Sequence, residues 1–172
     1  MAFPCALMPG VMRMMVVMNK AQIDEFIQLL RKYELSIATL YETFATILPS
    51  SRKAWMAYAN EERLHAKWIN ALHAQMNNEK ISFEQTKFTT QSTITAIDYI
   101  ENQIDKVVKS KTDLKQALII AIDIEKSLLD SAFFRVFKLS GPKAVKIQSR
   151  LVEATKAHIE GLIEWQANIK KA

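Results

Sequence analysis

The sequence predicts an all-α protein, a four-helix bundle made of two antiparallel helix hairpins that a long helical crossover joins. The 172 residues include only three Gly and four Pro, so long stretches are free of helix breakers. Apolar residues recur at spacings of three and four in four segments. Two short turns and one long connection separate these segments, which is the loop pattern of a bundle with a crossover.

The first hairpin is expected to consist of a helix over residues 20–48 and a second helix that fades into the polar stretch 75–80. Pro49 ends the first helix, and Ser50 and Ser51 are suitable N-caps for the second. The apolar stripe of the first helix comprises Phe26, Ile27, Leu30, Ile37, Ala38, Tyr41, Phe44, Ala45 and Leu48. That of the second comprises Trp55, Tyr58, Ala59, Ala66, Ile69 and Leu72.

The crossover over residues 78–111 is expected to contain an additional amphipathic helix. The third bundle helix begins after a Thr112 cap and extends to Val136, and Ser140-Gly141-Pro142 separates it from the fourth. The crossover stripe comprises Ile94, Ile97, Ile100, Ile104, Val107 and Val108. The buried face of the fourth helix comprises Leu151, Ala154, Leu162 and Trp165.

Residues 1–18 differ from the rest, because they hold six of the eight methionines. Pro4 and Pro9 interrupt their apolar run and Arg13 comes late, so the segment does not have the pattern of a signal peptide. We expect an irregular segment, a candidate misassigned start, followed by one bundle domain over residues 19–172. The chain has no run of about 20 apolar residues, which predicts no membrane partner.

Charge and cysteine content exclude other classes. The net charge is +5 and the pI is near 9.3, but Lys and Arg are scattered among acidic residues. Without a basic stripe, a nucleic-acid partner is not expected. The single cysteine, Cys5, excludes an intramolecular disulfide framework and is consistent with a reducing compartment, so the expected location is the cytoplasm.

Five side chains that commonly bind metals interrupt the apolar stripes of all four bundle helices: Glu34, Glu62, His65, Glu125 and His158. Burying an ionised carboxylate costs several kcal/mol unless a positive group meets it. Glu62 and His65 are three residues apart, hence on one helix face. A bundle whose helices present Glu and Glu-x-x-His toward its interior builds a two-metal carboxylate site, so a bound cation is the simplest common cause.

Each residue also has a reading without metal. A lone inward His is commonly a hydrogen-bonded core residue, and a single Glu in an apolar stripe often reaches solvent at the boundary. Tyr41 either packs in the core or acts near the metals as a hydrogen-bond donor or one-electron relay. Glu42 and Glu61 are expected to face solvent, and His73 is expected to be structural or exposed. The sequence identifies no acid that would orient either candidate histidine ligand.

Two stretches resemble rubrerythrins of the ferritin-like superfamily. The first has Glu34, a Tyr seven residues later and then Phe44-Ala45, and the second is Glu62-Arg-Leu-His65-Ala-Lys. The resemblance spans about residues 20 to 170 and rests, in the third and fourth helices, on Glu125 and His158. It implies a ferritin-like fold and an iron or manganese site with Glu62 and Glu125 as bridges and Glu34 as a terminal ligand.

The chain departs from this family pattern at Thr155, where a carboxylate three residues before His158 would be expected. Three carboxylates and two histidines leave two divalent ions one charge short, so either two iron ions or one is expected, with manganese as an alternative. The residues also lack the four-cysteine rubredoxin unit of typical rubrerythrins. An external electron-donor protein is therefore implied, and a homodimer remains open.

Three functions remain open from the sequence. The first is a rubrerythrin-like oxidoreductase, of peroxidase or ferroxidase type, that reacts with peroxide or dioxygen. The second is a metal-binding or iron-buffering bundle without turnover. The third is a metal-free interaction bundle with a degenerate site.

Overall fold

A computed structural model describes residues 19–76, 82–83, 90–130, 137–138 and 141–169, and structural statements here concern these residues. It contains five α-helices: α1 (Lys20–Ile47), α2 (Arg52–Met76), α3 (Thr90–Lys109), α4 (Leu114–Asp130) and α5 (Pro142–Ile169). A 3-10 turn at Pro49–Ser51 joins α1 to α2. The predicted all-α class is confirmed.

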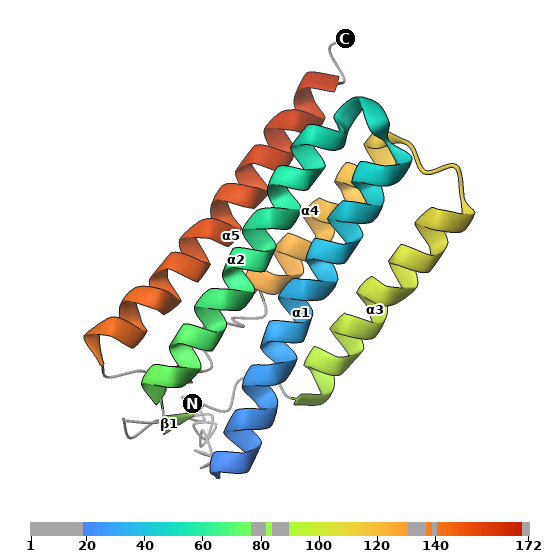
Figure 1. Cartoon of the computed structure of the whole chain (residues 1–172). Coiled ribbons are helices and arrows are strands. Elements are labelled where there is room, and N and C mark those ends of the chain that lie inside the picture. The colour runs from blue at the N-terminus through green and yellow to red at the C-terminus, as the bar shows by residue number, and fades with distance from the viewer. Residues whose placement is uncertain (1–18, 77–81, 84–89, 131–136, 139–140, 170–172) are drawn as a thin grey trace, which may run out of the picture.

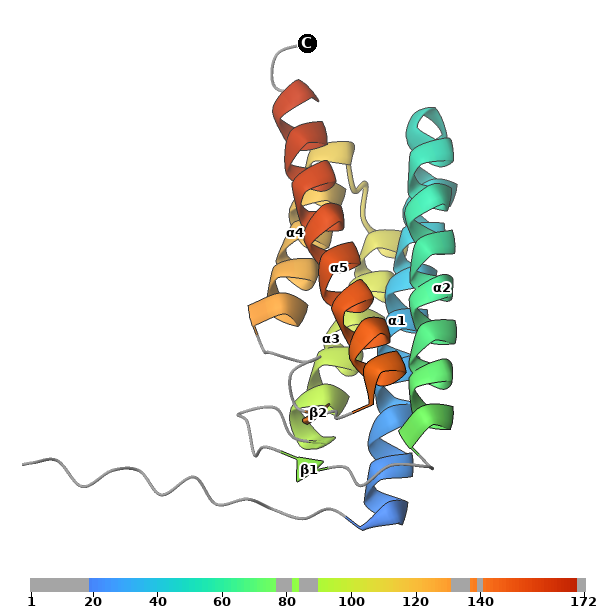
Figure 2. The same cartoon turned by 90° about the vertical axis from the view of Figure 1, so that its left-hand side faces the viewer.

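Helices α1, α2, α4 and α5 run along a common direction and form the bundle, with α3 on its outside beside α1 (Figures 1 and 2). α1 packs on α2 and α4 packs on α5, while α2 also packs on α5. The two hairpins and the helical crossover are thus as predicted. The bundle interior holds an apolar core, and α3 covers the outer side of α1.

The helix starts depend on side-chain caps, and two predicted caps are wrong. α1 has a capping box in which Asn19 and Gln22 accept from each other's backbone N–H at 3.0 and 2.9 Å. At α2, the Ser51 hydroxyl instead donates to the Leu48 carbonyl. At α4, the carboxylate of Asp113 accepts from the Gln116 N–H at 2.8 Å, so Asp113 is the cap. The hydroxyl of Thr112, the predicted cap, is hydrogen-bonded to that of Ser110.

The crossover helix α3 follows the predicted stripe with one exception. Ile97, Ile100 and Val107 are buried, but Val108 is 63% exposed. Adjacent residues on a helix point about 100° apart, so only one of the two valines can face α1. The exposed position of Val108 corrects its assignment to the stripe.

A short antiparallel pairing was not predicted. Residues 82–83 (β1) pair with 137–138 (β2), so the crossover and the α4–α5 connection meet at one end of the bundle. The predicted continuation of the third bundle helix through 131–136, the start of its terminating turn at Ser140 and the N-terminal segment 1–18 lie outside the described residues. At α5, the Gly141 carbonyl accepts from Val145 and Pro142 is the first helical residue, as predicted.

Within the described ranges, no helix is long and apolar enough to cross a bilayer.

We predict that Asp113→Ala lowers the free energy of unfolding by about 1 kcal/mol, because the Gln116 N–H loses its acceptor. Asn at this position should preserve most of the stability, since its side-chain oxygen can take the same hydrogen bond. Urea unfolding of both variants measures the difference. A larger loss in Thr112→Ala than in Asp113→Ala would contradict the cap assignment.

Candidate metal centre

The five predicted side chains converge in the interior of the bundle. Their exposed fractions are small: Glu34 0%, Glu62 0%, His65 2%, Glu125 1% and His158 3%. They come from α1, α2, α4 and α5, so every helix of the bundle contributes at least one. Because each lies within an apolar stripe, the packing that buries the stripe also buries the polar side chain.

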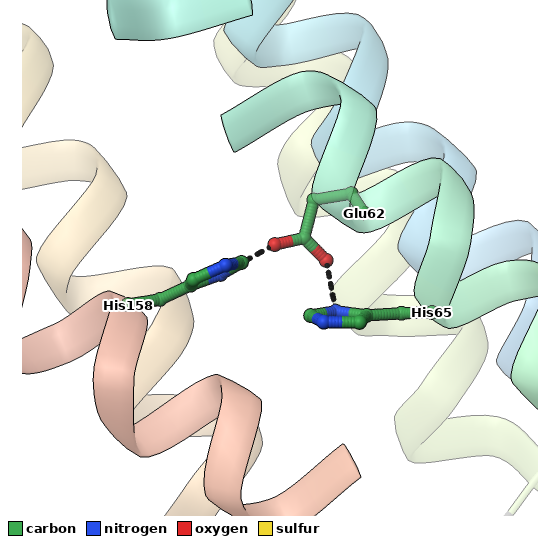
Figure 3. Close-up of side chains that lie close together, drawn as sticks. All are labelled: Glu62, His65 and His158. Atoms are coloured by element: carbon green, nitrogen blue, oxygen red, sulfur yellow. Dashed lines mark hydrogen bonds and ion pairs between the residues drawn. The ribbon is translucent and has the colours of Figure 1, made fainter. Parts of the chain in front are cut away.

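Glu62 lies at the centre of this group. Its Oε2 is 2.9 Å from Nδ1 of His65, and its Oε1 is 2.7 Å from Nδ1 of His158 (Figure 3). One potential ligand atom from each of these three residues lies within 4.8 Å of those of the other two. A carboxylate from α2 therefore links an imidazole on its own helix to one on α5.

The other two carboxylates extend the group to either side. Glu125 Oε1 is 3.3 Å from Nδ1 of His158, and Glu34 Oε2 is 3.7 Å from Nδ1 of His65. The result is two sets of two carboxylates and one imidazole that share Glu62. The rings of His65 and His158 lie with centroids 5.1 Å apart.

Three buried oxygens in this group have no hydrogen-bond partner among the described residues: both carboxylate oxygens of Glu34, and Oε1 of Glu62. His158 reaches Glu62 Oε1 at an ion-pair distance but without the alignment of a hydrogen bond. Buried polar atoms are nearly always satisfied, so this cluster calls for a further partner. Carboxylate oxygens with imidazole nitrogens suit a divalent iron or manganese ion, and the residues fit such a group.

The charges of the group are strongly coupled. Burial raises the pKa of Glu34 well above its usual value. Burial, and then the charge of Glu62, raise the pKa of Glu125. Burial also acts to raise the pKa of Glu62, but hydrogen bonds from His158 and His65 outweigh it and hold that pKa below its usual range.

The histidines shift in the opposite sense to a simple buried imidazole. Burial opposes the charged form of His65, but hydrogen bonds with Glu34 and Glu62 raise its pKa to about 10. Burial likewise opposes protonation of His158, and Glu125 and Glu62 raise its pKa to about 12. Without a metal, protons on the imidazoles supply positive charge to the buried carboxylates. A metal ion would have to displace them.

Thr155 is buried one turn before His158, but it brings no charge to the group. Its exposed fraction is 1%, and its hydroxyl donates to the Leu151 carbonyl of its own helix at 3.0 Å. The clustered side chains thus comprise the expected three carboxylates and two histidines.

Glu61 is the neighbour of the site that sequence reasoning missed. Its side chain is 58% exposed, as predicted, yet its Oε2 lies 2.6 Å from Nε2 of His158. With Nε2 on Glu61, the Nδ1 of His158 faces Glu62 and Glu125. Only the rotation of α2 against α5 brings Glu61 to this ring, and no sequence spacing signals it.

The remaining polar side chains are as expected or close to it. Tyr41 is fully buried, and its hydroxyl donates to Oε1 of Glu125 at 2.8 Å, which places it beside the group. His73 pairs through Nε2 with Asp24 at 2.6 Å and ties α2 to α1, which is a structural position. Glu42 forms a surface salt bridge with Arg63.

Comparison with known proteins supplies one match. The model of the family described as Rubrerythrin matches residues 25–162, which include all five clustered side chains. No curated protein and no solved structure matches the chain.

We predict that Glu61→Ala weakens divalent-metal binding by about 10- to 100-fold, because the carboxylate that orients His158 is lost. Glu61→Gln should weaken it less, since the amide oxygen can still accept from Nε2–H. Competition with a chromophoric chelator measures both affinities. Glu153→Ala removes an exposed acid from α5 and controls for net charge. An equal loss in that variant would assign the effect to charge alone.

Proposed function

The chain belongs to the rubrerythrin family, and we propose that it is a non-haem ferritin-like oxidoreductase whose buried Glu and His side chains hold iron or manganese for reaction with peroxide or dioxygen. The observation that carries the proposal is the cluster of three unpartnered carboxylate oxygens within the bundle. Such oxygens destabilise a fold unless a positive group meets them. The likeness of both helix motifs to the family supports the same assignment.

The geometry suggests how the ligands divide. Glu34, Glu62 and His65 form one set, and Glu62, Glu125 and His158 form the other, so Glu62 is the candidate bridge. Glu125 also came from the family resemblance as a bridge, but its printed contacts lie on the His158 side. Three carboxylates carry three negative charges against the four of two divalent ions. We therefore expect either one ion, or two ions with an anion from solution.

Bound iron or manganese would supply the two electrons that convert hydrogen peroxide, with two protons, into two molecules of water. The chain's own residues set the conditions. Glu34, Glu62 and Glu125 would compensate the cationic charge, and the buried apolar stripes keep bulk water from the group. Tyr41 holds Glu125 by a hydrogen bond, and Glu61 holds His158, so both ligands are oriented before metal enters.

The wider setting belongs to the same proposal. A peroxidase cycle needs electrons, and the chain's one cysteine cannot form a four-cysteine iron centre. We therefore include an external electron-donor protein as a partner and the cytoplasm as the location. A homodimer is compatible with the bundle and remains part of the proposal only as an alternative to a monomer.

One observation favours a second candidate, the metal-free interaction bundle. His65 and His158 already form ion pairs with the buried carboxylates, so protons could balance part of the charge without any metal. This arrangement still leaves both oxygens of Glu34 without a hydrogen bond. The two candidates differ in their response to added metal.

Added Fe(II) or Mn(II) is predicted to raise the melting temperature under anaerobic conditions, because the ion binds the folded chain only. At a free concentration of about 100 times Kd the stabilisation is about 2.7 kcal/mol. Glu62→Gln keeps the side-chain volume but removes the shared charge, and should abolish the shift. Glu42→Gln, a surface control, should retain it. No shift in the unaltered chain would favour the metal-free bundle.

Rapid mixing of the Fe(II)-loaded chain with hydrogen peroxide should produce a change in iron absorption and consume peroxide. With a chemical reductant present, we expect repeated turnover. A single stoichiometric oxidation followed by retention of the iron would instead identify iron buffering. Glu125→Gln should reduce the rate, because it weakens the ligand set that Tyr41 also contacts.

A further inference from the structure

A series of aromatic rings leads away from the candidate metal centre toward the surface. Tyr41 on α1 lies with its ring centroid 5.4 Å from that of Trp55 on α2, and Trp55 lies 4.9 Å from Trp165 on α5. The rings come from three helices and from positions far apart in sequence. No single helix period would place them in a row.

The inner end of this row meets the centre directly. The Tyr41 hydroxyl donates to Glu125 Oε1 at 2.8 Å. A branch runs beside it, because Tyr58 lies 5.2 Å from His158 and 6.2 Å from Trp55, measured between ring centroids. Two residues of the set that contains Glu62, Glu125 and His158 are therefore connected to Trp55.

The outer end of the row reaches a surface cavity. Trp165 is half-buried and lines a cavity of about 570 Å³ together with Lys53, Ser50 and Leu114. Trp55, by contrast, has 0% exposure. The route thus runs from a buried carboxylate, through a fully buried ring, to a ring at a hollowed surface.

The polar atoms along the row differ in a way that matters for charge movement. The Tyr41 hydroxyl has a proton acceptor in hydrogen bond, the carboxylate of Glu125. The Trp55 Nε1–H has no acceptor among the described residues. A tyrosine loses an electron readily only if its proton has somewhere to go, whereas an indole can lose an electron and keep its proton. Tyr41 and Trp55 have the surroundings that each of these processes requires.

We propose that Tyr41, Trp55 and Trp165 form an electron-transfer route between the candidate metal centre and the surface cavity beside Lys53. The physiological use of the route rests on the proposed function, in which hydrogen peroxide is the oxidant. A one-electron reductant at the cavity, such as a small redox protein, supplies the electron. Each electron that enters at Trp165 leaves at the centre.

The step balances as follows when an oxidising equivalent reaches the aromatic row. Tyr41 gives up one electron, and its O–H bond breaks as the proton passes to Oε1 of Glu125. Trp55 returns an electron to the tyrosyl radical, and the proton returns from Glu125 to re-form the O–H bond. Trp165 then reduces the Trp55 radical cation, and the external reductant restores Trp165.

Two competing descriptions predict different variants to matter. In the first, the rings only pack in the core, which is the commoner role of buried aromatics. In the second, charge leaves by another ring, Trp68, whose centroid is 5.3 Å from that of His65. Trp68 is also half-buried, so it provides a matched control.

The test injects an oxidising equivalent at the surface of the full chain prepared without iron or manganese. A ruthenium polypyridyl complex is attached at Lys53→Cys in a Cys5→Ser background, and a flash with a soluble electron acceptor oxidises the complex. Transient absorption and electron paramagnetic resonance then measure the yield of tyrosyl radical. Because no redox metal is present, failure here and failure of metal binding are separate results.

A tyrosyl radical is expected that disappears in Tyr41→Phe and in Trp55→Phe, and that persists in Trp68→Phe. Trp165→Phe should slow its appearance. A yield that Trp55→Phe leaves unchanged, or that depends on Trp68 or Tyr58 in place of Tyr41, would overturn the route.

A second measurement guards against a variant that fails to fold. Fluorinated tryptophans, incorporated biosynthetically, keep the indole shape and raise its oxidation potential. They should slow tyrosyl formation in the otherwise unaltered chain. Unchanged kinetics with fluorinated rings would contradict the proposal even if Trp55→Phe were too unstable to study.

Discussion

Burial of five ionisable side chains in one bundle interior is the constraint on which the rest of this structure depends. A carboxylate removed from water destabilises the fold by several kcal/mol unless positive charge lies beside it. Here Glu62 meets two imidazoles at 2.9 and 2.7 Å, and Glu125 meets one of them at 3.3 Å. Such contacts require the four helices to be in register. The polar group thus specifies the alignment of the bundle at the same time as it forms a site.

The neighbours of the group are arranged by the same requirement. Glu61, at the surface, holds the outer nitrogen of His158, and Tyr41, fully buried, holds Glu125. One contact therefore comes from the solvent side and one from the core side. Together they leave the inward-facing atoms of His158 and Glu125 free to meet a shared partner. An ion that entered would find its ligands oriented in advance, which reduces the entropy lost on binding.

The surroundings of the group are unequal. On one side, Tyr41, Tyr58 and Trp55 bring polarizable rings close to Glu125 and His158. Glu34, on the other side, has neither oxygen in a hydrogen bond. The side with the rings offers a path for electrons, whereas the side with free carboxylate oxygens offers the stronger demand for a cation. Thr155 leaves the ligand set one charge poorer, so the balance between protons and metal in this interior is a property of this chain.

The sequence alone determined the helices and the identity of the clustered side chains. Apolar spacing, Pro49 and Pro142 are local signals, and they located the five helices; the three-residue interval put Glu62 and His65 on one face. What only the tertiary structure decided depends on how helices rotate and pack against one another. That rotation brought exposed Glu61 to His158, put Val107 rather than Val108 against α1, paired 82–83 with 137–138 and lined up Tyr41, Trp55 and Trp165. Hydrophobic period reports which face of a helix is buried, but the partner of a given atom depends on a second helix whose orientation no local pattern contains.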